Sequence, residues 1–135
     1  MSRVYLCARY SRNAEMRSYA ADLGRYGYYV QAEWITGSHD QTPDEKCAAI
    51  DWKEVTAADI VISFTEPPGP VKGRGRGGRH VEFGAALAMG KRCIVVGHRE
   101  NVFHHMPHVE FYPSWQACFG ELMREGKLMT LEALR

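Results

Sequence analysis

The sequence predicts an α/β fold: an open parallel sheet of the flavodoxin-like or Rossmann-like kind, with about five strands and helices on both faces. Two observations support this prediction. Short apolar runs alternate with segments of helical periodicity, which is the pattern of successive β-α-β units. The apolar runs are also nearly continuous, as in parallel strands that are buried on both faces. With 135 residues, 45% of them hydrophobic, the chain is expected to form a single domain over residues 1–135.

The first predicted β-α-β unit occupies the N-terminal part of the chain. Residues 4–8 are apolar and predict the first strand. Asn13 is a candidate N-cap for a helix whose apolar residues recur at helical spacing until Gly27. β-branched and aromatic residues then predict a second strand over residues 28–34.

A second helix and a third strand follow a polar loop. Residues 42–45 have the spacing of a capping box, with Pro43 at the first helical position. We expect a helix to about residue 58, either continuous or broken near residues 50–51, where Asp51 would cap a second short helix. Residues 60–64 form the clearest buried strand of the sequence.

The second half of the chain repeats the same alternation. After a Pro/Gly/Arg loop over residues 66–79, the expected elements are a helix over 80–89, a strand over 93–96, a short strand over 109–112 and a final helix from the cap Ser114 to about 124.

Composition excludes several classes of protein. Lys and Arg number 17 against 16 Asp and Glu, so the chain is no polycation, and we expect no nucleic acid polymer as partner. No apolar run reaches the roughly 18 residues of a membrane span, and the first apolar stretch is too short for a signal peptide. The four cysteines are far apart, which predicts neither a zinc clamp nor a disulfide framework. The expected setting is a reducing cytoplasm.

Ligands of such sheets bind beyond the carboxyl ends of the strands, which here are residues 9–13, 66–82 and 97–104. The middle segment contains four basic residues interleaved with glycines: Lys72, Arg74, Arg76 and Arg79. Arginine forks and glycine backbone N–H groups suit a phosphate, but a solvated surface loop is equally compatible with the pattern. A match to the dinucleotide fingerprint at residues 73–78 follows the third strand, whereas that fingerprint belongs directly after the first.

Histidines at the end of the third segment and directly after it are weak candidates for a metal site. His104, His105 and His108 precede Glu110, but Pro107 interrupts helical geometry and no second half of a site follows. We therefore expect solvated loop histidines and no metal.

Glu82 is the strongest candidate for chemistry. It is expected in the first turn of the helix after the basic loop, where a carboxylate complements the helix dipole. The same position beside a ligand crevice would keep it anionic at neutral pH and make it a nucleophile. Asp51 is either a helix cap or a second carboxylate in the crevice, and Asp59 is expected to bond local backbone. The phenol of Tyr5, inside the first strand, needs a partner if it is buried.

Three segments together resemble the nucleoside 2-deoxyribosyltransferase family, which includes 2'-deoxynucleoside 5'-monophosphate N-hydrolases. They are residues 4–8 (VYLCA), 51–61 (DWKEVTAADIV) and 78–91 (GRHVEFGAALAMGK). The resemblance implies that Glu82 attacks the anomeric carbon of deoxyribose, that Asp51 is the catalytic aspartate and that Tyr5 orients the nucleophile. It implies neither a metal nor a redox cofactor. It also implies a homodimer or higher homo-oligomer in which a neighbouring chain closes the site, for which residues 101–104 are the candidate segment.

One departure from the family concerns the substrate. Transferases of free nucleosides carry an aspartate six residues before the nucleophile, where this sequence has Arg76. Arginine suits a 5'-phosphate better than a 5'-hydroxyl. The candidate substrate-binding residues are Arg9, Ser11, Arg12, Arg76, Gly78, Arg79 and Asn101.

Three functions follow as hypotheses. The first is an enzyme that cleaves the N-glycosidic bond of 2'-deoxynucleoside 5'-monophosphates through a covalent Glu82 intermediate. The second is a transferase that exchanges bases on free deoxynucleosides. The third is a non-catalytic nucleotide-binding module. Each takes a small-molecule ligand, and none involves a membrane.

Overall fold

The computed structural model describes residues 1–69 and 76–134 and confirms the predicted fold class. Five strands form one sheet in the order β2-β1-β3-β4-β5, and every neighbouring pair is parallel. The strands are β1 (Ser2–Cys7), β2 (Tyr28–Val30), β3 (Ile60–Phe64), β4 (Arg92–Val96) and β5 (Glu110–Tyr112). The strand order changes direction between β1 and β3, which is where a ligand crevice of a doubly wound sheet forms.

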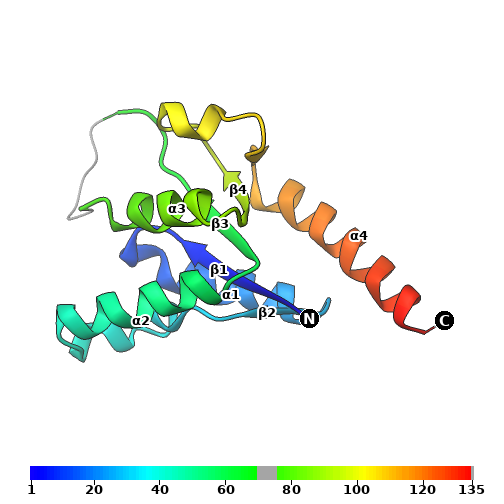
Figure 1. The fold of residues 1–135 in the computed structure, drawn as a ribbon, viewed down its shortest axis with the longest axis horizontal. Helices are drawn as coiled ribbons and strands as arrows, with labels where there is room; N and C mark the ends of the chain where they lie inside the picture. Colours follow the sequence, from blue (N-terminus) through cyan, green and yellow to red (C-terminus); the bar gives the residue numbers. More distant parts are fainter. Residues whose placement is uncertain (70–75, 135) are drawn as a thin grey trace.

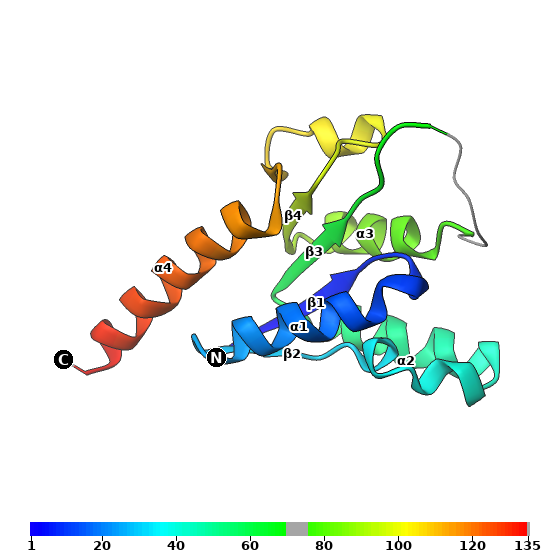
Figure 2. The same ribbon diagram turned by 180° about the vertical axis from the view of Figure 1, so that it is seen from behind.

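Helices cover both faces of this sheet (Figures 1 and 2). The four α-helices are α1 (Asn13–Gly24), α2 (Asp44–Ala57), α3 (Gly78–Ala88) and α4 (Trp115–Ala133). α2 packs with α3 on one face, and α1 packs with α4 on the other. Among the residues described, no helix combines the length and the apolar character that crossing a membrane requires.

The core lies between the sheet and these two helix layers. All five residues of β3 are buried, as are residues 4–7 of β1, because both strands are central. On the α1/α4 face, Tyr19 stacks on Phe64 and on Trp115, with ring centroids 5.2 and 4.5 Å apart. The near-continuous apolar strands of the sequence are therefore explained by burial on both faces.

Several predicted helix starts were wrong. Asn13 is not an N-cap, because a 3-10 turn (η1, Tyr10–Arg12) leads directly into α1 and Arg12 takes the capping position without a side-chain bond. The capping box before α2 does not form, since the Thr42 hydroxyl donates to the Ser38 carbonyl at 2.8 Å. α2 runs without a break through Asp51.

Other boundaries also moved. The second strand ends at Val30, and the chain then forms two 3-10 turns, η2 (Glu33–Thr36) and η3 (Ser38–Gln41). α3 begins two residues earlier than expected, because Gly77 (φ +82°) turns the chain into the helix. The Ser114 cap is confirmed, with its hydroxyl accepting the Ala117 N–H at 3.2 Å, but α4 continues well past residue 124.

Gly126 lets α4 pass close to the turn before β2. A Cβ at this position would collide with the Tyr26 carbonyl oxygen. One turn earlier, the Tyr28 hydroxyl donates to the Leu122 carbonyl at 2.7 Å and fixes the same crossing. The glycine is thus required by close approach rather than by backbone conformation.

We expect Gly126→Ala to lower the free energy of unfolding by about 1–3 kcal/mol, the usual effect of overpacking. The matched control is Gly120→Ala in the same helix, where a Cβ meets nothing within 4 Å. That control should be neutral or stabilising by up to ~1 kcal/mol. Urea unfolding of both variants measures the difference, and equal effects would contradict the close crossing.

Candidate active site

Tyr5 and Glu82 meet between the central strand and α3. The Tyr5 side chain leaves β1 on the face covered by α2 and α3, and its hydroxyl donates a short hydrogen bond to Glu82 Oε2. Tyr5 is fully buried, so the phenol cannot turn to solvent for another partner. The structure therefore brings together the two residues that the resemblance pairs, and their catalytic roles stay predictions.

The environment of Glu82 favours its protonated form. Burial raises the pKa of Glu82 to about 8, the hydrogen bond from Tyr5 lowers that pKa, and the charges of Asp51 and Glu54 raise it. Burial, followed by the Glu82 charge, also raises the pKa of Tyr5 far above its usual value, so Tyr5 remains a donor at any physiological pH.

The expectation that Glu82 stays anionic at neutral pH was wrong. It assumed a place in the first turn of the helix, but α3 starts at Gly78 and no acidic residue lies in its first turn. The dipole effect fades beyond that turn. Burial then outweighs it, and the carboxyl group is mostly protonated at pH 7 before a ligand binds.

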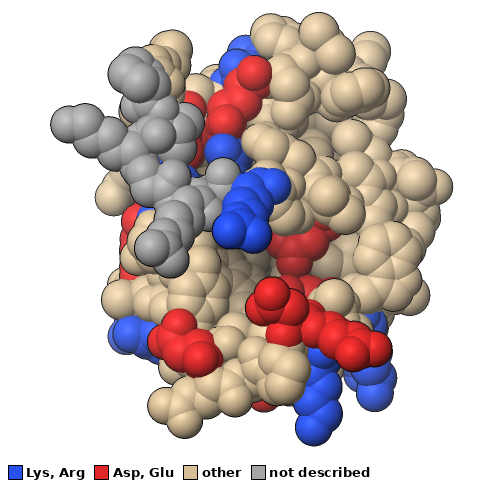
Figure 3. Space-filling view, turned by 90° about the vertical axis from the view of Figure 1, so that its left-hand side faces the viewer, with Lys and Arg blue, Asp and Glu red and all other residues tan. Residues whose placement is uncertain are grey.

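Asp51 lies in the middle of α2, the helix that packs with α3, and we refer to the recess on the face where these two helices begin (Figure 3) as the α2/α3 crevice. It is not a helix cap; its Oδ1 lies 2.8 Å from His39 Nε2 on η3. Burial raises the pKa of Asp51, whereas the contact with His39 lowers it. The charge of Asp51 is one of those that raise the pKa of Glu82, so the two carboxyl groups interact across the space between α2 and α3.

Two functional candidates escaped the sequence analysis. Glu54 follows Asp51 by three residues on the same helix face, is 7% exposed, and accepts the Glu33 N–H with both oxygens at 3.1 and 3.2 Å. The i, i+3 spacing of two acids was a usable signal for it. His39 carried no such signal, because only the path of η3 brings it to Asp51.

Figure 3 looks onto the end of the molecule where α2 and α3 begin. Acidic side chains gather across the lower part of this face, and an acidic surface lies in its central recess. This distribution agrees with the effect of the Asp51 and Glu54 charges, which both raise the pKa of Glu82. The crevice is therefore a partly buried site with clustered carboxyl groups.

The arginines after β1 are paired with carboxylates. Arg12 bonds Glu15 at 2.7 and 2.9 Å, Glu66 at 2.9 Å and the Thr65 carbonyl at 3.2 Å, and Arg9 contacts Glu66 at 3.4 Å. The bond to Glu15 is the main reason why the pKa of Arg12 is raised. Ser11 is exposed beside them. Arg9 and Arg12, both predicted to bind the substrate, thus donate hydrogen bonds to Glu66 instead.

A hollow of about 320 Å³ lies beside this ion pair on the α1/α4 face of the sheet. Its walls include Arg12, Glu66 and the aromatic rings of Tyr19, Phe64 and Trp115. Glu82 is not among the residues that line this hollow.

Arg79 is bound to Glu100 by a two-pronged ion pair, one bond of which is 2.9 Å. Glu100 also accepts the Glu66 N–H at 3.0 Å. Although burial acts in the opposite direction, these bonds hold the pKa of Glu100 below its usual value. The pair ties the start of α3 to the loop after β4.

The remaining candidates lie around this pair. Arg76 is exposed, and Gly78 is the first residue of α3. Asn101 accepts the Phe103 N–H at 3.0 Å and caps the 3-10 helix η4 (Val102–His105). Lys72 and Arg74 lie outside the described residues. A contribution of residues 101–104 to a neighbouring chain stays a prediction.

The expectation of a solvated His104 was wrong. The side chain is 1% exposed, its Nδ1 accepts the Glu100 N–H at 3.0 Å, and Phe83 packs edge-on against the ring at 5.4 Å. Burial lowers the pKa of His104. The residue is a neutral core histidine that anchors η4 on α3.

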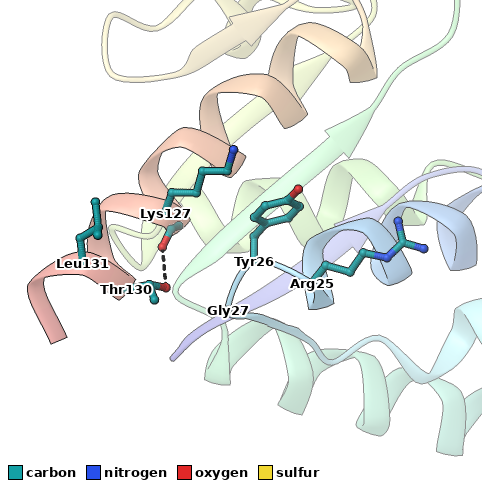
Figure 4. A pocket seen from close by; sticks show the side chains of 7 residues that line it. Arg25, Tyr26, Gly27, Lys127, Thr130 and Leu131 are labelled. Carbon is teal, nitrogen blue, oxygen red and sulfur yellow. Dashed lines mark hydrogen bonds between the residues drawn. The ribbon is translucent and has the colours of Figure 1, made fainter. Parts of the chain in front are cut away.

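A further hollow of about 370 Å³ lies far from the carboxyl ends of the strands (Figure 4). It opens between the turn before β2 and the C-terminal half of α4, and Arg25, Tyr26, Lys127 and Leu131 are among its lining residues. No carboxyl group lines it. It therefore lacks the chemistry of the α2/α3 crevice.

Glu82→Gln should stabilise the protein more as the pH rises. The carboxyl group binds a proton more tightly in the folded state (pKa about 8) than in the unfolded state (about 4.5), so wild-type stability falls between these two values. Glutamine carries no such charge. We expect similar Tm values for both proteins at pH 4.5 and a Tm a few degrees higher for the variant at pH 8.5.

The control is Glu45→Gln, which alters an exposed carboxylate in the first turn of α2. Its Tm difference from wild type should not grow with pH over this range. A Glu82→Gln difference that is constant from pH 4.5 to 8.5 would show that the folded state does not raise this pKa.

Comparison with known proteins gives a likeness to a solved structure. No family model and no curated protein matches the chain. Among solved structures, a CMP N-glycosidase from Clostridium botulinum, BcmB, superposes with a TM-score of 0.62. The two chains are 23% identical over 89% of this chain and 97% of the other. The likeness shows that this chain has the same α/β fold as the Clostridium botulinum CMP N-glycosidase.

Proposed function

We propose that this protein cleaves the N-glycosidic bond of nucleoside 5'-monophosphates, with Glu82 as the nucleophile. The observation that carries the proposal is the arrangement of Glu82: a partly buried carboxyl group bonded by Tyr5 and opposed by Asp51 on the facing helix. The shared fold with a CMP N-glycosidase supports it. The resemblance of three sequence segments to the deoxyribosyltransferase family agrees with both.

The proposed reaction has two steps. Ionised Glu82 attacks C1' of the sugar while the C1'–N bond breaks through an oxocarbenium-like state, giving a glycosyl ester and the free base. Water then attacks C1' and releases Glu82. Asp51 supplies a proton to the departing base, for which its raised pKa is suited. Tyr5 keeps one Glu82 oxygen bonded and so directs the other toward the sugar.

We propose 2'-deoxynucleoside 5'-monophosphates as the substrates. Arg76 replaces the aspartate that the family's free-nucleoside transferases use, and it is exposed at the entrance to α3. CMP is a second candidate, because the structural neighbour is named for it. Base exchange on free deoxynucleosides is the competing reaction within the same chemistry, and ligand binding without bond cleavage is the competing non-catalytic function.

A substrate panel tests the proposal. Deoxynucleosides, their 5'-monophosphates and CMP are incubated with the protein, with and without an acceptor base, and released base is measured by chromatography. We expect release from monophosphates without acceptor. Glu82→Ala should reduce it by about 10³-fold or more, as loss of a nucleophile does, whereas Glu45→Ala should leave it unchanged. Exchange that requires an acceptor would favour the transferase, and binding without release would favour the non-catalytic module.

The pH profile tests the Tyr5–Glu82 pair. The profile is measured on 4-nitrophenyl 2-deoxyriboside 5-phosphate, whose leaving group needs no proton from Asp51. Because Glu82 must be ionised to attack, kcat/KM for this substrate should rise with pH and level off above about 8. Tyr5→Phe removes the hydrogen bond that lowers the pKa of Glu82, so the rising limb should move to higher pH by roughly one unit. Tyr29→Phe, at an exposed tyrosine of β2, is the control. An unshifted limb in Tyr5→Phe would exclude this role for Tyr5.

A further inference from the structure

His39 and Asp51 form a close pair that the proposed mechanism does not yet use. Their Nε2 and Oδ1 atoms lie 2.8 Å apart. His39 comes from η3 and Asp51 from the third turn of α2, so two elements present the pair to the crevice. The side chains are 9% and 25% exposed, which leaves the Asp51 carboxyl group accessible and the imidazole covered.

The backbone around His39 is fixed by local bonds. Gly37 adopts φ +85° and reverses the chain between η2 and η3. The Thr42 hydroxyl donates to the Ser38 carbonyl at 2.8 Å, and the Thr42 N–H donates to the His39 carbonyl at 3.3 Å. The imidazole therefore approaches Asp51 from a defined direction.

Among the residues that the structure describes, Asp51 is the only hydrogen-bond partner of the His39 imidazole. Its Nδ1 atom is buried and makes no hydrogen bond within residues 1–69 and 76–134. Burying an imidazole without any hydrogen bond costs free energy at both of its nitrogen atoms. Asp51 is thus the one group in the described structure that offsets the burial of this ring.

The charged groups around Asp51 act against its ionisation. Glu33 from η2 raises the pKa of Asp51, as burial does, and only His39 lowers it. Glu54 adds a further carboxyl group beside Asp51, and the charge of Asp51 raises the pKa of Glu54. A single proton between Asp51 and His39 keeps the pair neutral overall, which suits this acidic environment better than a bare carboxylate.

We propose that His39 is a positioning residue that shares one proton with Asp51 and thereby supplies the proton that the departing base receives. The inference rests on the proposed function and assigns it a further residue. His39 holds Oδ1 and so aims Oδ2 at the base. Asp51 has to donate a proton in the first step and accept one in the second. Without His39 it would have no hydrogen-bond partner to stabilise either its protonated or its ionised form.

The proton balance closes over the two steps. As the C1'–N bond breaks, its electron pair goes to the base, a Glu82 oxygen bonds to C1', and the shared proton moves from Asp51 to the base. In the second step a water oxygen bonds to C1', the electron pair of the ester bond returns to Glu82, and one water proton returns to the Asp51–His39 pair. The other water proton remains on the sugar hydroxyl.

The test compares two substrates whose leaving groups differ in their need for a proton. One substrate is the nucleotide that wild type cleaves best, and the other is 4-nitrophenyl 2-deoxyriboside 5-phosphate, whose phenolate leaves without protonation. The measured quantity is kcat/KM, which reports the steps up to departure of the leaving group and excludes the later attack by water. We expect His39→Ala to lower kcat/KM for the nucleotide by about 10²-fold, within the usual range of acid catalysis. For release of nitrophenol, kcat/KM should stay within a few-fold of wild type.

Two further variants separate proton transfer from a purely structural role. His39→Gln keeps a hydrogen-bond donor but cannot carry the proton, so it should resemble His39→Ala on the nucleotide. His108→Ala, at an exposed histidine before β5, is the control and should retain full activity. Thermal unfolding confirms that each variant is folded.

The outcomes are distinct. Equal slowing of both substrates, or full rescue by His39→Gln, would overturn the role of His39 while leaving the proposed function intact. A wild-type protein that releases neither base nor nitrophenol would overturn the proposed function and, with it, this inference.

Discussion

A single hydrogen bond between the central sheet and α3 organises the candidate site. Tyr5 is fixed by complete burial in β1, and its hydroxyl donates to Glu82 on a helix that arises after β3. The sheet holds the donor rigidly, and the helix therefore presents the carboxyl group at a set height above the carboxyl ends of the strands. A nucleophile on a loop would not be held so closely.

The distribution of charge divides the strand ends into two regions. On the α2/α3 face, Asp51, Glu54 and Glu82 lie close enough to affect one another's proton affinities. On the other face, Arg12 is neutralised by Glu15 and Glu66. A cluster of carboxyl groups favours positive charge in its vicinity, and an oxocarbenium-like sugar carries such a charge. The electrostatics of the crevice thus agree with glycoside chemistry better than with simple anion binding.

The sequence contained enough information for the fold because buried parallel strands are visible as apolar runs, and residues 60–64 were correct to the residue. It also indicated Tyr5, Glu82 and Asp51 as candidates. It could not indicate how they are protonated, since the pKa of Glu82 depends on burial and on a helix start that Gly77 displaces. The partners of Arg12 and Arg79 were equally hidden. The sequence shows that Arg12 and Arg79 are charged. Only the fold shows that Arg12 lies within hydrogen-bond distance of Glu66, and Arg79 of Glu100.

The two halves of the crevice differ in how far apart their partners lie along the chain. Asp51 and His39 are separated by 12 residues, whereas Tyr5 and Glu82 are separated by 77. Closing a long loop costs more chain entropy than closing a short one, and contacts between distant residues form late when a protein folds. The α2 side can therefore take shape while the chain is still largely unfolded. Glu82 reaches Tyr5 only once β1, β3 and α3 have docked, so a partly folded chain would carry the Asp51–His39 pair without the Tyr5–Glu82 contact.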